Sequence, residues 1–193
     1  MEPVIPTIFI GSYKGSPFLQ GCLDSIPADM SCIVVRDDGY ECGALRHTQQ
    51  HFQGDQFLFL QDSTKVKDPS WIYRIFEDSE TAWGLGEETG WGSMYMAKYR
   101  MEYFRQLIIP ETRTKMDAVV AEMALPNAYA RLDPNCKTLW PELRLENATP
   151  DRIFEREVMI YENEFFWKAK STWGGWMVTD SCMRDQARRQ QVA

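Results

Sequence analysis

Short polar clusters follow three apolar stretches in the first third of the sequence. Ser12 and Tyr13 follow the first stretch, Asp37 and Asp38 follow the second, and Asp62 follows the third. Hydroxyl and carboxylate oxygens accept hydrogen bonds, and carboxylates are also ligands of hard divalent cations. If the three clusters lie together, they form a polar site suited to a ligand with hydroxyl groups and negative charge.

The apolar stretches have the length and composition of buried β-strands. Residues 4–10, 31–35 and 56–60 are expected to form these strands, with helices over about 16–27 and 41–52 between them. Strands that are separated by helices pair in parallel through right-handed crossovers. Ligands of such sheets bind beyond the carboxyl ends of the strands. The sequence therefore predicts that the polar clusters meet at one edge of a mostly parallel sheet.

The elements that follow are predicted from the spacing of apolar residues and from prolines. Asp68 and Pro69 begin a helix with Trp71, Ile72, Ile75 and Phe76 on its buried face, and residues 81–85 form a fourth strand. Residues 84–92 are rich in glycine and are expected to be a mobile loop. Further helices are expected over residues 94–107, from Thr114 to Pro126, and from Thr149 to Phe154, whereas residues 158–167 fit no single pattern.

Charge and composition exclude several classes of protein. The 193 residues carry a net charge of −7, and an acidic chain of this kind is a poor ligand for nucleic acids. No stretch approaches the roughly 20 apolar residues of a membrane-spanning helix. The N-terminal residues lack the pattern of a signal peptide, so a cytoplasmic location is expected. The five cysteines include no C-x-x-C pair, which favours free thiols.

The strand ends resemble motifs of the glycosyltransferase-A fold, in particular those of family-2-like inverting glycosyltransferases. In that family the first strand ends in a polar turn, matched by residues 10–14. The second ends in Val-Val-Asp-Asp-Gly-Ser, matched by residues 34–39 with one inserted arginine, and the third ends in D-x-D, approximated by residues 60–63. The resemblance covers roughly residues 5–125. It implies an α/β, Rossmann-like nucleotide-diphospho-sugar transferase fold, with a mostly parallel central sheet flanked by helices.

The resemblance also implies which residues bind the nucleotide of a nucleotide-sugar donor. Asp37 and Asp38 would accept hydrogen bonds from the base or the ribose hydroxyls, and Tyr13 would stack on the base. Ser12 would offer its hydroxyl or its backbone, and Arg46 would pair with a phosphate. The alternatives are a simple turn at the end of a strand for the first four residues and a solvated helix residue for Arg46.

Asp62 is the predicted ligand of a divalent cation, Mn²⁺ or Mg²⁺. Negative charge develops on the diphosphate as the bond to the sugar breaks, and a cation held by oxygen ligands neutralises it. The D-x-D motif is incomplete, however, because Gln61 stands in place of its first carboxylate in one alignment and Ser63 in place of its second in another. The dependence on a metal is therefore open, and a degenerate site is a real alternative.

The family implies a general base late in the domain, at the start of a helix, and Asp117 stands at about that position. The alternative is structural, because Thr114 and Asp117 also have the spacing of a capping box. Glu87 and Glu88 are reserve candidates for the base. Glu88 and Trp91 are predicted to contact the acceptor, although Trp91 would fit the hydrophobic core equally well.

Together these features predict one domain over residues 1–193, with a nucleotide-binding part over about 1–80 and an acceptor part over about 81–180. The predicted activity is transfer of a sugar, with inversion, from a nucleotide-sugar donor to the hydroxyl of a glycan, protein or small molecule. One alternative is a binding module of the same fold that has lost catalysis. Another is a nucleotidyltransferase, although residues 11–16 lack the arginine of its usual glycine-rich signature. The small size resembles minimal bacterial or phage-encoded transferases.

Overall fold

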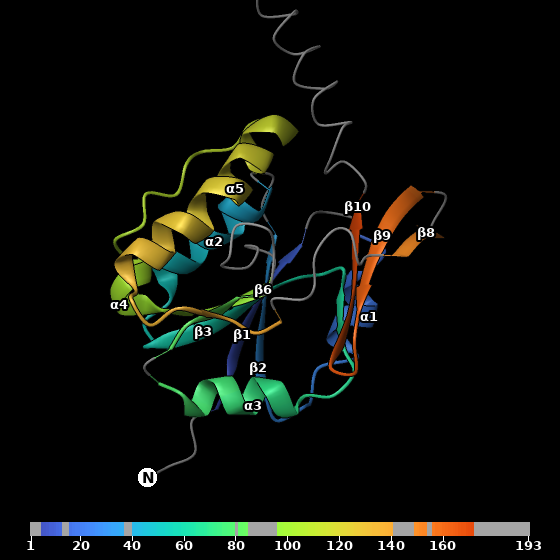
Figure 1. Ribbon diagram of the computed structural model, residues 1–193, viewed down its shortest axis with the longest axis horizontal. Helices are drawn as coiled ribbons and strands as arrows, with labels where there is room; N and C mark the ends of the chain where they lie inside the picture. The colour runs from blue at the N-terminus through green and yellow to red at the C-terminus, as the bar shows by residue number, and fades with distance from the viewer. Residues whose placement is uncertain are drawn as a thin grey trace, which may run out of the picture.

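A computed structural model describes most of the chain and shows a mixed α/β fold (Figure 1). The described residues are 5–12, 16–36, 40–79, 81–84, 96–140, 149–153 and 156–171. A central six-stranded sheet has the order β2-β1-β3-β6-β5-β7. Its strands are β1 (Thr7–Ser12), β2 (Ser31–Arg36), β3 (Gln56–Gln61), β5 (Trp83–Gly84), β6 (Met96–Arg100) and β7 (Lys137–Thr138).

The first three strands form the parallel part of this sheet, as the sequence predicts. β1 lies between β2 and β3 and runs parallel to both. β6 runs antiparallel to β3 and to β5, and β5 pairs in parallel with β7. The sheet is therefore mostly parallel, with one reversed strand in its interior.

Helices cover both faces of the sheet at β1 and β3, which explains why these two strands are apolar on both sides, whereas only Val35 is buried in the edge strand β2. Ile8 and Ile10 pack in one cluster with residues of α1 (Leu19–Leu23) and α3 (Ser70–Glu77). Phe9 points to the other face and packs with α2 (Tyr40–His51), α4 (Met101–Phe104) and α5 (Lys115–Leu132). Figure 1 shows α2 and α5 side by side on this second face.

This arrangement creates a switch point between β1 and β3. The chain leaves β1 through α1 on one face to reach β2, and it returns through α2 on the opposite face to reach β3. The connection from the carboxyl end of β1 thus leads to β2 on one side, whereas the strands of this sheet that follow β3 in the chain lie on the other side, beyond β3. In open α/β sheets ligands bind at such a point.

A second sheet continues from the end of β3. It contains four antiparallel strands in the order β4-β10-β9-β8, with bounds β4 (Thr64–Val66), β8 (Thr149–Ile153), β9 (Arg156–Glu162) and β10 (Phe166–Ser171). Val66, Tyr161 and Phe166 pack against the cluster beneath α1 and α3. The prediction of a helix from Thr149 to Phe154 is wrong, because residues 149–153 pair with β9 instead. Non-local pairing outweighs the local helix-start signal here.

Two further helix predictions need correction. Residues 96–100 of the expected helix 94–107 form β6, and of its described residues only Met101–Phe104 are helical. Met96, Ala97, Lys98 and Tyr99 are all buried, and a short run that is buried all round fits either a strand or a helix. Pro126 does not end α5, which continues to Leu132. The helix persists because Leu125 and Tyr129, on either side of the proline, are packed into the core.

The helix after Asp68 is confirmed. Trp71, Ile72, Ile75 and Phe76 form the buried face of α3, as their spacing predicts. Across the described part of the chain, no helix has both the length and the hydropathy needed to span a membrane.

Candidate functional site

The carboxyl ends of β1, β2 and β3 lie level with one another. Ser12, the last residue of β1, is in register with Arg36 of β2, and Gly11 is in register with Gln61 of β3. The backbone N–H of Asp62 donates to the carbonyl oxygen of Gly11 over 3.1 Å. The structure therefore brings Ser12 and Asp62 to the same edge, at the switch point, and both residues are buried there.

Asp62 has an unusual environment for a carboxylate. The residue is only 7% exposed, and its Oδ2 atom has no hydrogen-bond partner among the residues that the structure describes. Leaving a buried acceptor unpaired costs about 1–3 kcal/mol, and more when the group is charged. Such an atom is suited to accept a hydrogen bond from a ligand.

Lys168 reaches the same edge from the second sheet. β10 pairs with β4 so that Lys168 lies opposite Thr64, just after the turn formed by Asp62 and Ser63. Its Nζ atom donates to Oε1 of Gln61 over 2.7 Å and also to Oγ of Ser63. The residue is 1% exposed. The ammonium therefore bonds to the two residues that flank Asp62 in the sequence.

Sequence reasoning missed Lys168, although a signal was present. The residue is a lone lysine in the aromatic stretch from Phe165 to Ala169. A charged side chain in an otherwise apolar strand is buried only when it has partners. Those partners lie more than a hundred positions earlier in the chain, so the sequence alone did not identify them.

Gln61 connects Lys168 to a third element. Its Nε2 atom donates to Oε1 of Glu41, in the first turn of α2, while its own Oε1 accepts from Lys168. The amide is thus held in one orientation between a cation and a carboxylate. The network links the end of β3 to both sheets and to the start of α2.

The thiol of Cys22 on α1 is close to this network. Burial and, to a smaller extent, the Asp62 carboxylate raise the pKa of Cys22 to about 12, while the Lys168 ammonium acts in the opposite direction. The thiol is therefore protonated at neutral pH and is a poor nucleophile.

The described side chains at this edge do not fit a divalent cation well. A Mg²⁺ or Mn²⁺ site needs several oxygen ligands, preferably carboxylates. Of the three positions of the D-x-D segment, only Asp62 supplies a carboxylate, and Lys168 already bonds to the side-chain oxygens of Gln61 and Ser63. The ammonium would also repel a second cation. Within the described ranges, no three His, Cys, Asp or Glu side chains gather in a metal-binding arrangement.

Arg46 and Asp117 both make local structural contacts. The Nη1 atom of Arg46 donates to the carbonyl oxygen of Pro110 over 2.7 Å, which ties α2 to the segment before α5. The capping box is confirmed, because Oδ2 of Asp117 accepts from the backbone of Thr114 over 2.9 Å and Thr114 Oγ1 accepts from the backbone of Asp117 over 3.1 Å. Roles for these residues in phosphate binding and in catalysis stay predictions.

The remaining predicted site residues are not placed by the structure. Tyr13, Asp37, Asp38, Glu88 and Trp91 lie outside the described residues. Their predicted contacts with the nucleotide or the acceptor stay predictions.

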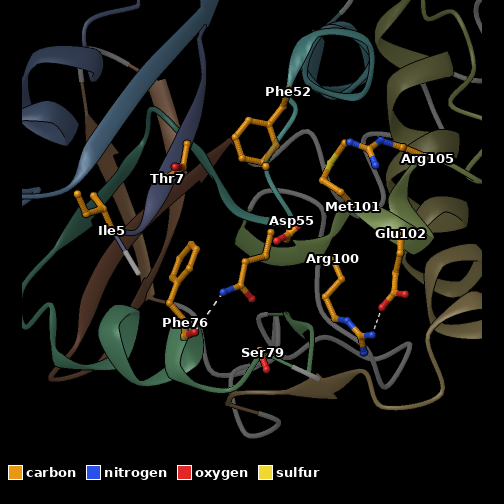
Figure 2. Close-up of a pocket in the computed structure, with 12 residues that line it drawn as sticks. Ile5, Thr7, Phe52, Asp55, Phe76, Ser79, Arg100, Met101, Glu102 and Arg105 are labelled. Carbon is orange, nitrogen blue, oxygen red and sulfur yellow. Dashed lines mark hydrogen bonds and ion pairs between the residues drawn. The ribbon is translucent and has the colours of Figure 1, made fainter. Parts of the chain in front are cut away.

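A separate concave region lies at the opposite edge of the sheet (Figure 2). Thr7 at the start of β1 and Arg100 at the end of β6 both line it, and its volume is about 580 Å³. Figure 2 shows the ion pair of Arg100 with Glu102 at its rim. The guanidinium of Arg100 also lies over the ring of Tyr103, 4.7 Å from its centre. The region is thus remote from the strand ends that carry the predicted motifs.

Comparison with known proteins supports the fold. No protein-family model and no curated protein sequence matches the chain. Among solved structures, A197 from STIV aligns with 87% of this chain and 95% of its own, with a TM-score of 0.51 and 12% sequence identity. The fold is similar to that of A197. The alignment with S. aureus TarS covers 70% of this chain and 35% of that protein, with a TM-score of 0.48 and 10% identity.

Proposed function

We propose that the chain is a glycosyltransferase that moves a sugar from a nucleotide-sugar donor to an acceptor hydroxyl. The observation that carries this proposal is the buried Oδ2 atom of Asp62, which has no partner in the described part of the chain and lies at the switch point. This is where an open α/β sheet binds a nucleotide. The likeness of residues 10–14, 34–39 and 60–63 to glycosyltransferase motifs adds the class of ligand.

In the proposed reaction the acceptor oxygen attacks the anomeric carbon of the sugar. A bond forms between these atoms as the bond from the carbon to the phosphate oxygen breaks, so that the nucleoside diphosphate leaves and the sugar inverts its configuration. The hydroxyl proton passes to a general base, for which Asp117 is the proposed residue. Asp62 accepts a hydrogen bond from a hydroxyl of the bound nucleotide and fixes its position.

A non-catalytic binding module is the second candidate. It is favoured by the contacts of Gln61 and Ser63 with Lys168, because two of the three positions of the metal-binding motif carry neutral side chains that bond to an ammonium. The two candidates differ in one measurable property. A transferase slowly hydrolyses its sugar donor when no acceptor is present, whereas a binding module does not.

The proposal is tested by thermal unfolding in the presence of nucleoside diphosphates and their sugar conjugates. A ligand that binds only the folded chain raises its stability, by about 2.7 kcal/mol at a concentration 100 times its Kd. We expect at least one nucleoside diphosphate to do so.

Substitution of Asp62 then locates the ligand. Asp62→Asn should weaken nucleotide binding about 10- to 100-fold, since a hydrogen bond to a charged group contributes about 1.5–3 kcal/mol. Asp55→Asn is the matched control, because Asp55 is exposed and lies at the other end of β3. Equal affinity of the Asp62→Asn variant and the unmodified chain would contradict the assignment of the site.

A further inference from the structure

The position of Lys168 raises the question of what supplies positive charge at the nucleotide-binding edge. The residue is 1% exposed, and a buried ammonium is unfavourable unless polar groups surround it. Here Oε1 of Gln61 and Oγ of Ser63 serve that purpose. These residues stand on either side of Asp62, so the ammonium lies beside the turn that carries the unpartnered carboxylate oxygen.

The types of these residues match an ammonium better than a divalent cation. A divalent cation requires a shell of about six oxygen ligands, with carboxylates to balance its charge. The amide of Gln61 and the hydroxyl of Ser63 are neutral, and two or three neutral or singly charged oxygens are sufficient for an ammonium with three N–H donors. Gln61 is also held by Glu41, so its oxygen remains directed at Lys168.

We infer that Lys168 takes the place of the divalent cation at this edge, so that nucleoside diphosphates bind without a metal. This inference rests on the proposed function. Lys168 is a positioning residue: its fixed positive charge orients Gln61 and Ser63 and offsets part of the charge of a diphosphate bound at the edge. A charge fixed by the fold needs no reorganisation when the ligand arrives.

The test measures binding of UDP and GDP by calorimetry, with excess EDTA and then with Mn²⁺. We expect the affinity of the unmodified chain to differ less than twofold between the two conditions. Lys168→Arg keeps the charge and should bind within a few-fold of the unmodified chain. Lys168→Gln removes the charge, so its affinity in EDTA should fall at least tenfold and should recover in part when Mn²⁺ is added.

Lys98→Gln is the matched control. Like Lys168, Lys98 is a fully buried lysine in a β-strand. It lies in β6 of the main sheet, however, and bonds to the carbonyl oxygens of Ile75 and Asp78 at the end of α3. Its substitution should lower the melting temperature without changing the nucleotide affinity in EDTA. An effect of Lys168→Gln that arose only from lost stability would appear in Lys98→Gln as well.

Two results would overturn the inference. One is a tenfold or greater increase in the affinity of the unmodified chain on addition of Mn²⁺. The other is a Lys168→Gln variant that binds in EDTA as tightly as the unmodified chain. If Lys168→Gln does not fold, the unmodified chain and Lys168→Arg still decide the matter.

A titration with Mn²⁺ alone separates failure of this inference from failure of the proposed function. If no nucleoside diphosphate binds under either condition, the proposed function fails. Even without nucleotide binding, the Mn²⁺ titration tests the inference. If the unmodified chain binds Mn²⁺ and the Asp62→Asn variant does not, the inference is overturned. If Mn²⁺ binds to the Lys168→Gln variant but not to the unmodified chain, the inference is supported.

Discussion

The Nζ atom of Lys168 lies 2.7 Å from the Oε1 atom of Gln61, although 107 positions separate the two residues in the sequence. The contact joins the end of the parallel sheet to the middle of the antiparallel one. It also places a positive charge beside Asp62, at the point where β1 and β3 present their carboxyl ends.

The capping and catalytic roles of Asp117 can be separated by two substitutions. Thr114→Ala removes the hydroxyl that caps α5 and should lower the free energy of unfolding by about 0.5–2 kcal/mol. Asp117→Asn keeps an oxygen that can accept from the Thr114 backbone, so we expect a smaller loss of stability. If Asp117 is the general base, only its substitution should slow sugar transfer, by about 10²- to 10⁴-fold. If the transfer rate falls in both variants only in proportion to their loss of stability, Asp117 has the capping role alone.

Gly11 should not tolerate a larger side chain. A Cβ atom at this position would lie 2.6 Å from Cζ of Phe59, whose ring is fully buried. Gly11→Ala should therefore destabilise the chain by about 1–3 kcal/mol, measured by denaturant unfolding. In the double variant Gly11→Ala/Phe59→Leu the smaller side chain relieves the clash, so the total loss of stability should be smaller than the sum of the two single losses. Purely additive losses in the two single variants would show that the two positions do not interact.

Lys98 should give the stability a distinctive dependence on pH. Burial lowers its pKa from 10.5 to about 8. Between these values the unfolded chain holds the proton and the folded chain has released it, so the contribution of Lys98 to stability increases as the pH rises from 8 to 10.5. This contribution to stability is lost as the pH falls from 10.5 through 8.

Lys98→Met is the reference for this measurement. It leaves the carbonyl oxygens of Ile75 and Asp78 without their donor, so it should be less stable by about 1–3 kcal/mol per orphaned group. The difference in free energy of unfolding between the unmodified chain and the variant should widen from pH 8 to pH 10.5. A constant difference would contradict the lowered pKa.

Cys22 should act in the opposite direction at alkaline pH. Its pKa is raised from 9.0 to about 12 by burial and by the Asp62 carboxylate. From pH 9 to 12 the unfolded thiol ionises while the folded thiol stays protonated, so its contribution to stability declines as the pH rises. Cys22→Ala should flatten this part of the stability profile. An unchanged slope would mean that the thiol titrates normally in the folded chain.

The sequence predicted the parallel half of the fold well. Residues 7–12 and 56–61 form strands whose apolar side chains are buried on both faces, and that pattern is local. Residues 31–36 also form a strand, but the expected burial is wrong, because β2 lies at the edge of the sheet and only its Val35 is buried. The edge that unites Ser12 and Asp62 followed from it, because parallel strands all end at the same edge of the sheet. The sequence also predicted the buried face of α3, since the helical period places Trp71 and Ile75 on the same side of the helix.

The second half was less predictable because its structure depends on partners far away in the chain. Met96–Arg100 and Thr149–Ile153 became strands through pairing with β3 and β9, against their local helical patterns. Pro126 remained inside α5 because packing of its neighbours outweighed the missing hydrogen bond. A single sequence contains no direct record of such pairings.

By itself, then, the sequence determined which residues end the parallel strands and that the Asp62 carboxylate stands at their common edge, since both follow from periodicity and chain direction. Only the tertiary structure decided what surrounds that carboxylate. The antiparallel sheet carries Lys168 to Gln61 and Ser63, and the strength of a charge interaction depends on distance and burial, which are set by folding rather than by position along the chain.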